Sequence, residues 1–80
     1  MVNKMFSYNI AKEADNKAFK KACAAIEAKI KSITGKRFAV DVDGSLVQTY
    51  DTPNGSITVF NDYEVDAVYA DSDVDLSEVL

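Results

Sequence analysis

The sequence predicts an α+β fold in which one amphipathic helix packs on an antiparallel sheet of four or five strands. Apolar residues at helical spacing fill the first half of the chain. Short segments rich in β-branched and aromatic residues fill the second half, and turn signals separate them. The 80 residues are enough for one small domain. We therefore expect a single domain with the element order β-α-β-β-β-β.

The first strand and the helix are expected before residue 35. Residues 5–10 place Phe6, Tyr8 and Ile10 on one side of an extended segment, which predicts a short strand. A helix is expected to begin at residue 11 or 15 and to end at residue 32, with Gly35 as its terminator. Its apolar face repeats at steps of three and four residues and comprises Phe19, Ala22, Cys23, Ile26, Ile30 and Ile33.

The remaining strands are expected to form three consecutive hairpins. Residues 37–43 alternate with period two, which places Phe38, Val40 and Val42 on one face and Ala39, Asp41 and Asp43 on the other. Asp43-Gly44 predicts a turn into a strand at residues 46–50. Further turns are expected at residues 51–55 and 61–62, and the last two strands at residues 56–60 and 63–70.

Residues 71–80 form an acidic tail with sparse valine and leucine. Two interpretations stay open at this point. The tail is either disordered and flexible, or it forms a terminal turn that docks Val79 and Leu80 on the domain.

The amino-acid composition argues against an enzyme. The chain has no histidine, which is the commonest general base and metal ligand, and Cys23 is its single cysteine. We therefore expect no catalytic residues, no cofactor and no metal. No apolar run is long enough to span a membrane, and the first residues lack the pattern of a signal peptide. The expected location is the cytoplasm, without a membrane partner.

Two short motifs resemble functional sites. Residues 38–45, an apolar strand followed by Asp41-Val-Asp43-Gly-Ser, resemble the first motif of haloacid-dehalogenase-type phosphatases. That resemblance implies a nucleophilic Asp41, an acid at Asp43 and magnesium, but no Lys or Arg follows Arg37 and the 36 residues after Gly44 are too few for that family's domain. Asp71, Asp73 and Asp75 begin like a calcium loop, but Leu76 replaces the required glycine. A metal-dependent hydrolase is therefore the least favoured of our three functional hypotheses.

Charge is strongly divided along the chain. Residues 38–80 contain ten acidic and no basic side chains, whereas residues 1–37 contain nine basic and three acidic ones. Strand carboxylates two residues apart are expected to point the same way at about 7 Å, a spacing that approximates backbone phosphates. We expect two such pairs, extended by the tail, to contact a partner. The candidate residues are Asp41, Asp43, Glu64, Asp66, Asp71, Asp73 and Asp75.

In size and charge layout, the chain resembles small phage-encoded DNA-mimic proteins. These include the uracil-DNA glycosylase inhibitors, the anti-restriction proteins and inhibitors of the histone-like HU nucleoid protein. The resemblance implies a non-enzymatic inhibitor that binds a basic DNA-binding protein in the host cytoplasm and does not itself bind nucleic acid. The alternative is a structural or assembly module that acts as a homodimer, in which the alanine-rich helix packs against its twin.

Overall fold

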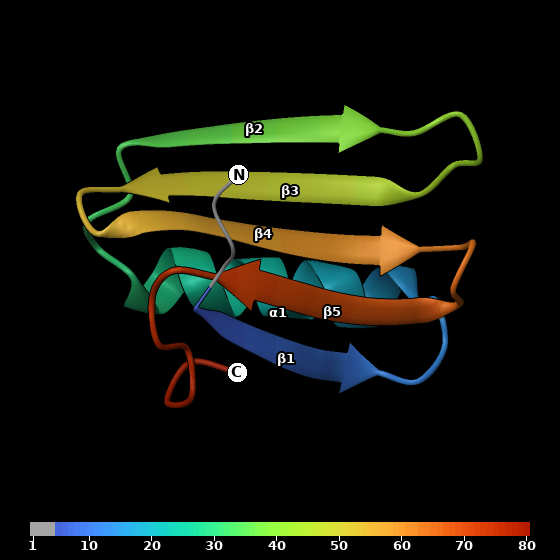
Figure 1. Cartoon of the computed structure of the whole chain (residues 1–80), viewed down its shortest axis with the longest axis horizontal. Helices are drawn as coiled ribbons and strands as arrows, with labels where there is room; N and C mark the ends of the chain where they lie inside the picture. Colours follow the sequence, from blue (N-terminus) through green and yellow to red (C-terminus); the bar gives the residue numbers. More distant parts are fainter. Residues whose placement is uncertain (1–4) are drawn as a thin grey trace.

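The computed structural model describes residues 5–80, which form one helix and five strands. Figure 1 shows the helix layer lying behind a single antiparallel sheet, which confirms the predicted α+β class and the β-α-β-β-β-β order. The elements are β1 (Phe6–Ala11), α1 (Asn16–Lys29), β2 (Gly35–Val40), β3 (Leu46–Thr52), β4 (Gly55–Asp62) and β5 (Ala67–Ser72).

The strands lie in the order β1-β5-β4-β3-β2, so the first and last strands of the chain are neighbours. β2 to β5 form the three expected hairpins, and α1 carries the chain from the β1 edge of the sheet to the β2 edge. The helix packs against β4 and β1. We call the sheet face opposite α1 the open face.

The helix begins one residue after Asp15, whose carboxylate accepts hydrogen bonds from the backbone N–H groups of Lys17 at 2.8 Å and Ala18 at 3.4 Å. Four residues of the predicted apolar face are buried, namely Phe19, Ala22, Cys23 and Ile26. The prediction of the helix end was wrong, because α1 ends at Lys29 and Gly35 begins β2. Branched side chains at 30, 33 and 34 favour extended backbone, and Ile30 adopts it with φ −94° and ψ 99°.

The core lies between α1 and the sheet. Alternate residues of β3, β4 and β5 point toward the helix, and Tyr50, Ile57, Val59, Val68 and Ala70 are completely buried there. Ile30 and Ile33 pack on this core from the segment that follows the helix. No helix among residues 5–80 has the length and apolar character needed to cross a bilayer.

Buried polar groups join the two layers. The Asn61 amide accepts a hydrogen bond from the Asp15 N–H at 3.0 Å and donates one to the Asn16 side chain at 2.8 Å. At the other end of the helix, the Tyr50 hydroxyl donates to the Glu27 carboxylate at 2.7 Å. These bonds hold both ends of α1 against the sheet.

The third turn lies at residues 63–66 rather than at the predicted 61–62. Buried Asn61 holds β4 in the sheet through this point. The turn follows because the Asp62 carboxylate accepts from the N–H groups of Glu64 at 2.9 Å and Val65 at 3.3 Å. The second turn is tighter than predicted, with only Pro53 and Asn54 between β3 and β4.

The segment after β5 is docked on the domain. Leu76 is completely buried, and the Tyr8 hydroxyl accepts from its backbone N–H at 2.7 Å while donating to Asp75 at 3.1 Å. Of the two interpretations of the tail, the structure has the docked terminal turn. Its anchor is Leu76, whereas Leu80 is 41% exposed.

The predicted apolar face of β2 lies on the helix side of the sheet but is largely uncovered. Phe38 is 56% exposed and Val40 61% exposed, and Val42 lies fully exposed beyond the strand end. The reason is the position of α1, which packs against β4 and β1 rather than beneath the β2 edge.

Candidate protein-binding surface

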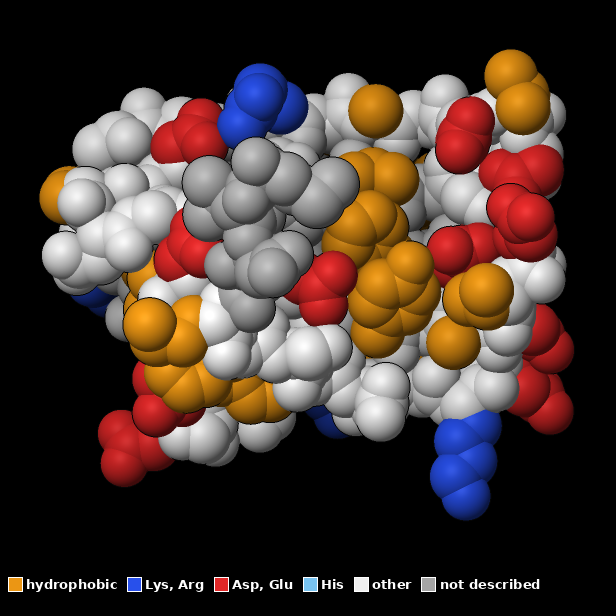
Figure 2. Space-filling model, viewed as in Figure 1, with side chains coloured by type: hydrophobic (Ala, Val, Ile, Leu, Met, Phe, Trp, Pro, Cys, Tyr) orange, Lys and Arg blue, Asp and Glu red, His pale blue; other side chains and the backbone are white. Residues whose placement is uncertain are grey.

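A row of apolar side chains crosses the open face of the sheet. Strand register places Ala39 opposite Val47, Val47 opposite Phe60, and Phe60 opposite Tyr69. The Phe60 and Tyr69 rings are stacked, with centroids 4.7 Å apart and planes inclined by 19°. Both rings are half-buried, so part of each aromatic side chain lies at the surface of the open face. We call Ala39, Val47, Phe60 and Tyr69 the apolar row. Figure 2 shows an orange band across the open face.

Carboxylates gather on one side of the apolar row, at the end of the sheet where the β2–β3 and β4–β5 turns lie side by side. We call Asp41, Asp43, Asp62 and Glu64 the turn-end cluster; together with Phe60 and Tyr69 they line a hollow of about 130 Å³. Figure 2 shows red side chains grouped at this end of the sheet. The Tyr69 hydroxyl donates to Asp62 at 3.1 Å. Burial and this bond to a carboxylate raise the pKa of Tyr69, so its hydroxyl keeps its proton at neutral pH.

A second group of carboxylates, which we call the mid-strand cluster, lies beyond the other side of the apolar row. It comprises Asp51, Asp71 and Asp73. The Asp71 carboxylate accepts from the Ser7 hydroxyl at 3.0 Å, and Asp73 accepts from the Ser56 N–H at 3.0 Å. Asp71 lies opposite Thr58 in the register of β4 and β5, and Thr58 lies four residues before Asp62 on β4. At about 3.3 Å per residue, Asp62 and Asp71 lie about 13 Å apart along the strands, whereas Asp51, which pairs with Ser56, lies about 20 Å from Asp62.

Basic side chains are concentrated on the helix layer. Lys17, Lys20, Lys21 and Lys29 are exposed on α1. The five strands contain only two basic residues, and both have acidic partners: Lys36 lies 3.2 Å from Glu27 of the helix, and Arg37 lies 3.0 Å from Asp51. The division of charge along the sequence therefore becomes a division between the two layers of the fold.

The sequence predicted that Asp41 and Asp43, and Glu64 and Asp66, are pairs along single strands, but the structure places all four in turns. β2 ends at Val40, so Asp41 and Asp43 lie in the following loop, and Glu64 and Asp66 lie in the β4–β5 turn. Asp66 has φ 56° and its carboxylate accepts from the Ala14 N–H at 2.9 Å, in the loop before α1. Asp41, Asp43 and Glu64 do come together in the turn-end cluster, through adjacent turns rather than along one strand.

Asp71, Asp73 and Asp75, which the sequence predicted to contact a partner as one row, lie in different places in the structure. Asp71 lies on β5 and Asp73 bonds to the start of β4, but Asp75 supports the docked tail by accepting from the Ser77 N–H at 2.9 Å and from Tyr8. Sequence reasoning missed Asp51, Asp62 and the two stacked aromatic rings. The alternation of Thr58, Phe60 and Asp62 was the available signal, because it places all three on one face of a strand.

Two exposed carboxylates make stability depend on pH. The Ser45 N–H lowers the pKa of Asp43, and the Ser77 N–H, with a smaller contribution from Tyr8, lowers the pKa of Asp75, in each case from an ordinary 3.8. A lowered folded-state pKa contributes stability above the unfolded pKa and loses it as the pH falls through the folded value.

We therefore expect the free energy of unfolding to fall as the pH drops below about 4. Urea denaturation between pH 7 and pH 2 measures this decline. The variant Asp75→Ala should show a shallower decline than the wild type, whereas Glu13→Ala should retain the full decline. Equal curves for all three proteins would contradict the assignment to Asp75.

No family model, curated protein or solved structure matches this chain.

Proposed function

We propose that the protein is a non-enzymatic inhibitor that binds the basic DNA-binding surface of another protein and excludes DNA. The observation that carries the proposal is the separation of charge between the layers. Carboxylates flank the apolar row on the open face, the two strand cations are paired with acids, and four exposed lysines lie on α1. A basic surface would be attracted to one side of the molecule and repelled by the other.

The spacing of the carboxylates supports a nucleic-acid-like role. Asp62 of the turn-end cluster and Asp71 of the mid-strand cluster are separated by about 13 Å along β4 and β5. This is close to the width of the DNA major groove, about 12 Å, whose two sides carry phosphates. A protein surface that contacts phosphates across a groove would find carboxylates at a comparable separation.

The apolar row gives the surface a feature that DNA lacks. Protein interfaces commonly have an apolar, often aromatic centre within a polar rim, and Phe60 and Tyr69 have this arrangement between the two acidic clusters. Contact with these rings would not be screened by salt. We therefore infer that binding to the target depends less on salt than the target's own binding to DNA.

The proposal predicts that neutral variants of the open face bind a basic DNA-binding protein more weakly. With the histone-like HU nucleoid protein as the first probe, Glu64→Gln/Asp71→Asn should lower the affinity at low salt by about tenfold, because two favourable charge interactions are lost. Isothermal titration calorimetry measures the affinity, and added duplex DNA should compete with the wild-type protein for the probe.

The matched control is Glu13→Gln/Glu78→Gln, which changes the net charge equally but lies outside the open face. It should bind like the wild type. A set of basic DNA-binding proteins extends the test beyond the first probe. Simultaneous binding of DNA and this protein by every probe that it binds, or equal affinities of the two double variants, would contradict the proposal.

The alternative function, a homodimeric assembly module, is favoured by a different observation. β2 is an edge strand with exposed apolar side chains at Phe38 and Val40. The two functions are compatible, since a dimer would present two open faces.

A further inference from the structure

β2 offers a free strand edge within the described part of the chain. It lies at the end of the strand order, and it pairs with β3 in unbroken register from Gly35 opposite Asp51 to Val40 opposite Leu46. The Asp41 N–H points toward β3, where it donates to the Ser45 carbonyl at 2.8 Å. Because backbone groups alternate along an antiparallel strand, those of Phe38 and Val40 point away from β3. They are placed to pair with another strand.

This edge has few of the features that normally prevent pairing. Edge strands are commonly protected by bulges, prolines or free lysines. β2 contains neither a bulge nor a proline, and its two cations are engaged by Glu27 and Asp51. The opposite edge differs, because β1 has an irregular register between Asn9 and Ala11.

The sequence of the edge is complementary to itself. Arg37 precedes the apolar residues of β2 and Asp41 follows them. We propose that a second copy of this chain pairs with β2 in antiparallel orientation, with Ala39 on the two-fold axis. In this register Arg37 lies opposite the second copy's Asp41, and Phe38 opposite its Val40. A parallel pairing in register would instead place like charges together.

Pairing in this register would join the two sheets into one of ten strands. Opposite residues of an antiparallel pair point to the same face, so both open faces would lie on one side. The apolar rows of the two copies would meet at Ala39. The inference does not depend on the proposed inhibitor function, because it rests on the edge alone.

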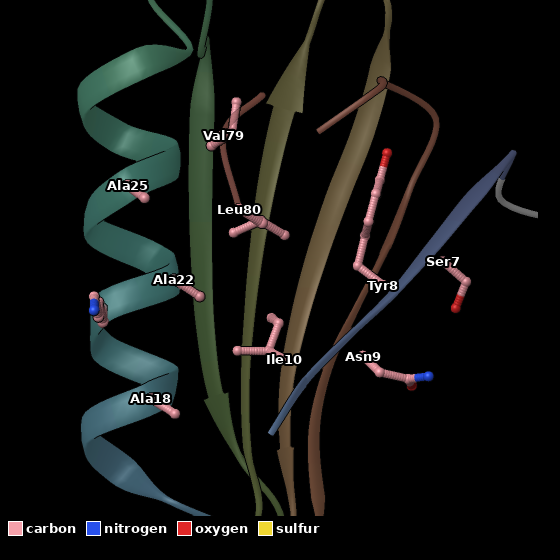
Figure 3. Close-up of a pocket in the computed structure, with 10 residues that line it drawn as sticks. Ser7, Tyr8, Asn9, Ile10, Ala18, Ala22, Ala25, Val79 and Leu80 are labelled. Carbon is pink, nitrogen blue, oxygen red and sulfur yellow. The ribbon is translucent and has the colours of Figure 1, made fainter. Parts of the chain in front are cut away.

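The helix is a poorer surface for self-association. Figure 3 shows Ala18, Ala22 and Ala25 pointing into a groove of about 620 Å³, which Ile10 of β1 and Leu80 of the tail also line. The outer surface of α1 carries Ala24 among exposed lysines such as Lys17 and Lys20. Two such surfaces repel each other, which favours β2 as the contact.

Cysteine cross-linking tests the register. Ala39 and its copy would form a non-hydrogen-bonded pair, with Cα atoms about 4.5 Å apart, which is within the range of a disulfide. Oxidation of Ala39→Cys should therefore give a covalent dimer in high yield. Asn9→Cys on β1 and Ala24→Cys on α1 should form little covalent dimer under the same oxidation, as should the wild type with its buried Cys23.

Charge exchange tests the ionic contact independently. Sedimentation velocity at low salt should show a reversible dimer of the wild type. Each of Arg37→Asp and Asp41→Arg should weaken dimerisation by about tenfold, because attraction becomes repulsion on both sides of the axis. Asp41→Arg has a matched control in Glu78→Arg, which has the same charge change and should dimerise normally.

The double variant Arg37→Asp/Asp41→Arg restores opposite charges across the axis and should recover dimerisation. A variant that merely loosened β2 would not recover in this way. The proposal is overturned if the wild type stays monomeric at high concentration, if Asn9→Cys or Ala24→Cys cross-links better than Ala39→Cys, or if the double variant is no better than the single ones.

Discussion

Replacing Leu76 with alanine is expected to lower the free energy of unfolding by about 3 kcal/mol, because a completely buried leucine is truncated and a cavity remains. Leu76 belongs to the cluster that contains Ile26 and Tyr50, although it lies beyond the last strand and four residues before Leu80. For a domain of this size, the loss would be a large part of the total stability. Urea denaturation followed by circular dichroism measures it.

The same substitution at Leu80 serves as the control. Leu80 lies in the same segment but is 41% exposed, so Leu80→Ala should cost less than about 1 kcal/mol. Similar losses for the two variants would show that Leu76 is not a specific anchor. A negligible effect of Leu76→Ala would show that the tail is not packed on the domain in solution.

Gly55→Ala is expected to have the second large effect, with a loss of about 2 to 3 kcal/mol in the free energy of unfolding. Gly55 has φ 129°, a conformation that residues with a side chain rarely adopt. An added Cβ would also overlap the side chain of Asp73, including its Cβ atom, which limits how far Asp73 can move away. Thermal denaturation and urea titration both measure the loss.

The other two glycines separate backbone strain from steric overlap. Gly44 has φ 88°, but a Cβ there would meet only the Tyr63 ring at 3.6 Å, so Gly44→Ala should cost about 1 kcal/mol from strain. Gly35 has no positive φ, and its added Cβ would meet Asp51 at 3.4 Å, so Gly35→Ala should be nearly neutral. Any order other than Gly55, Gly44 and Gly35 in decreasing cost would contradict this explanation.

Elements governed by local periodicity could be predicted from the sequence. The repeat of Phe19, Ala22, Cys23 and Ile26 identified the buried face of α1 correctly. The glycine and proline signals located the first two hairpins. The helix end was misplaced because Ile30 and Ile33 continue the apolar spacing, yet they contact the core from positions after the end of the helix. The spacing of apolar residues indicates which side of a segment faces the core, but it does not by itself indicate the backbone conformation of that segment.

The candidate surface was harder to predict because it depends on contacts between distant segments. The proximity of Asp41 and Glu64 follows from the adjacency of two turns that lie 23 positions apart in the sequence. The pairing of β1 with β5 likewise has no local signal. Some carboxylates that were predicted to bind a partner instead form hydrogen bonds within the domain, Asp66 with Ala14 and Asp75 with Tyr8. A count of acidic residues in the sequence could not distinguish carboxylates that stabilise the fold from carboxylates that are available for binding.

The buried amide of Asn61 has a consequence for the uniqueness of the folded state. Its two polar atoms are satisfied at the start of the helix, by the N–H of the capping residue Asp15 and by the Asn16 side chain. If α1 slid along the sheet by one turn, the apolar side chains would still find apolar neighbours, but the completely buried amide would lose both partners. An unpaired buried amide costs about 1 to 3 kcal/mol. Asn61 therefore penalises misaligned packings, so that one alignment of helix and sheet is selected among several that are similarly apolar.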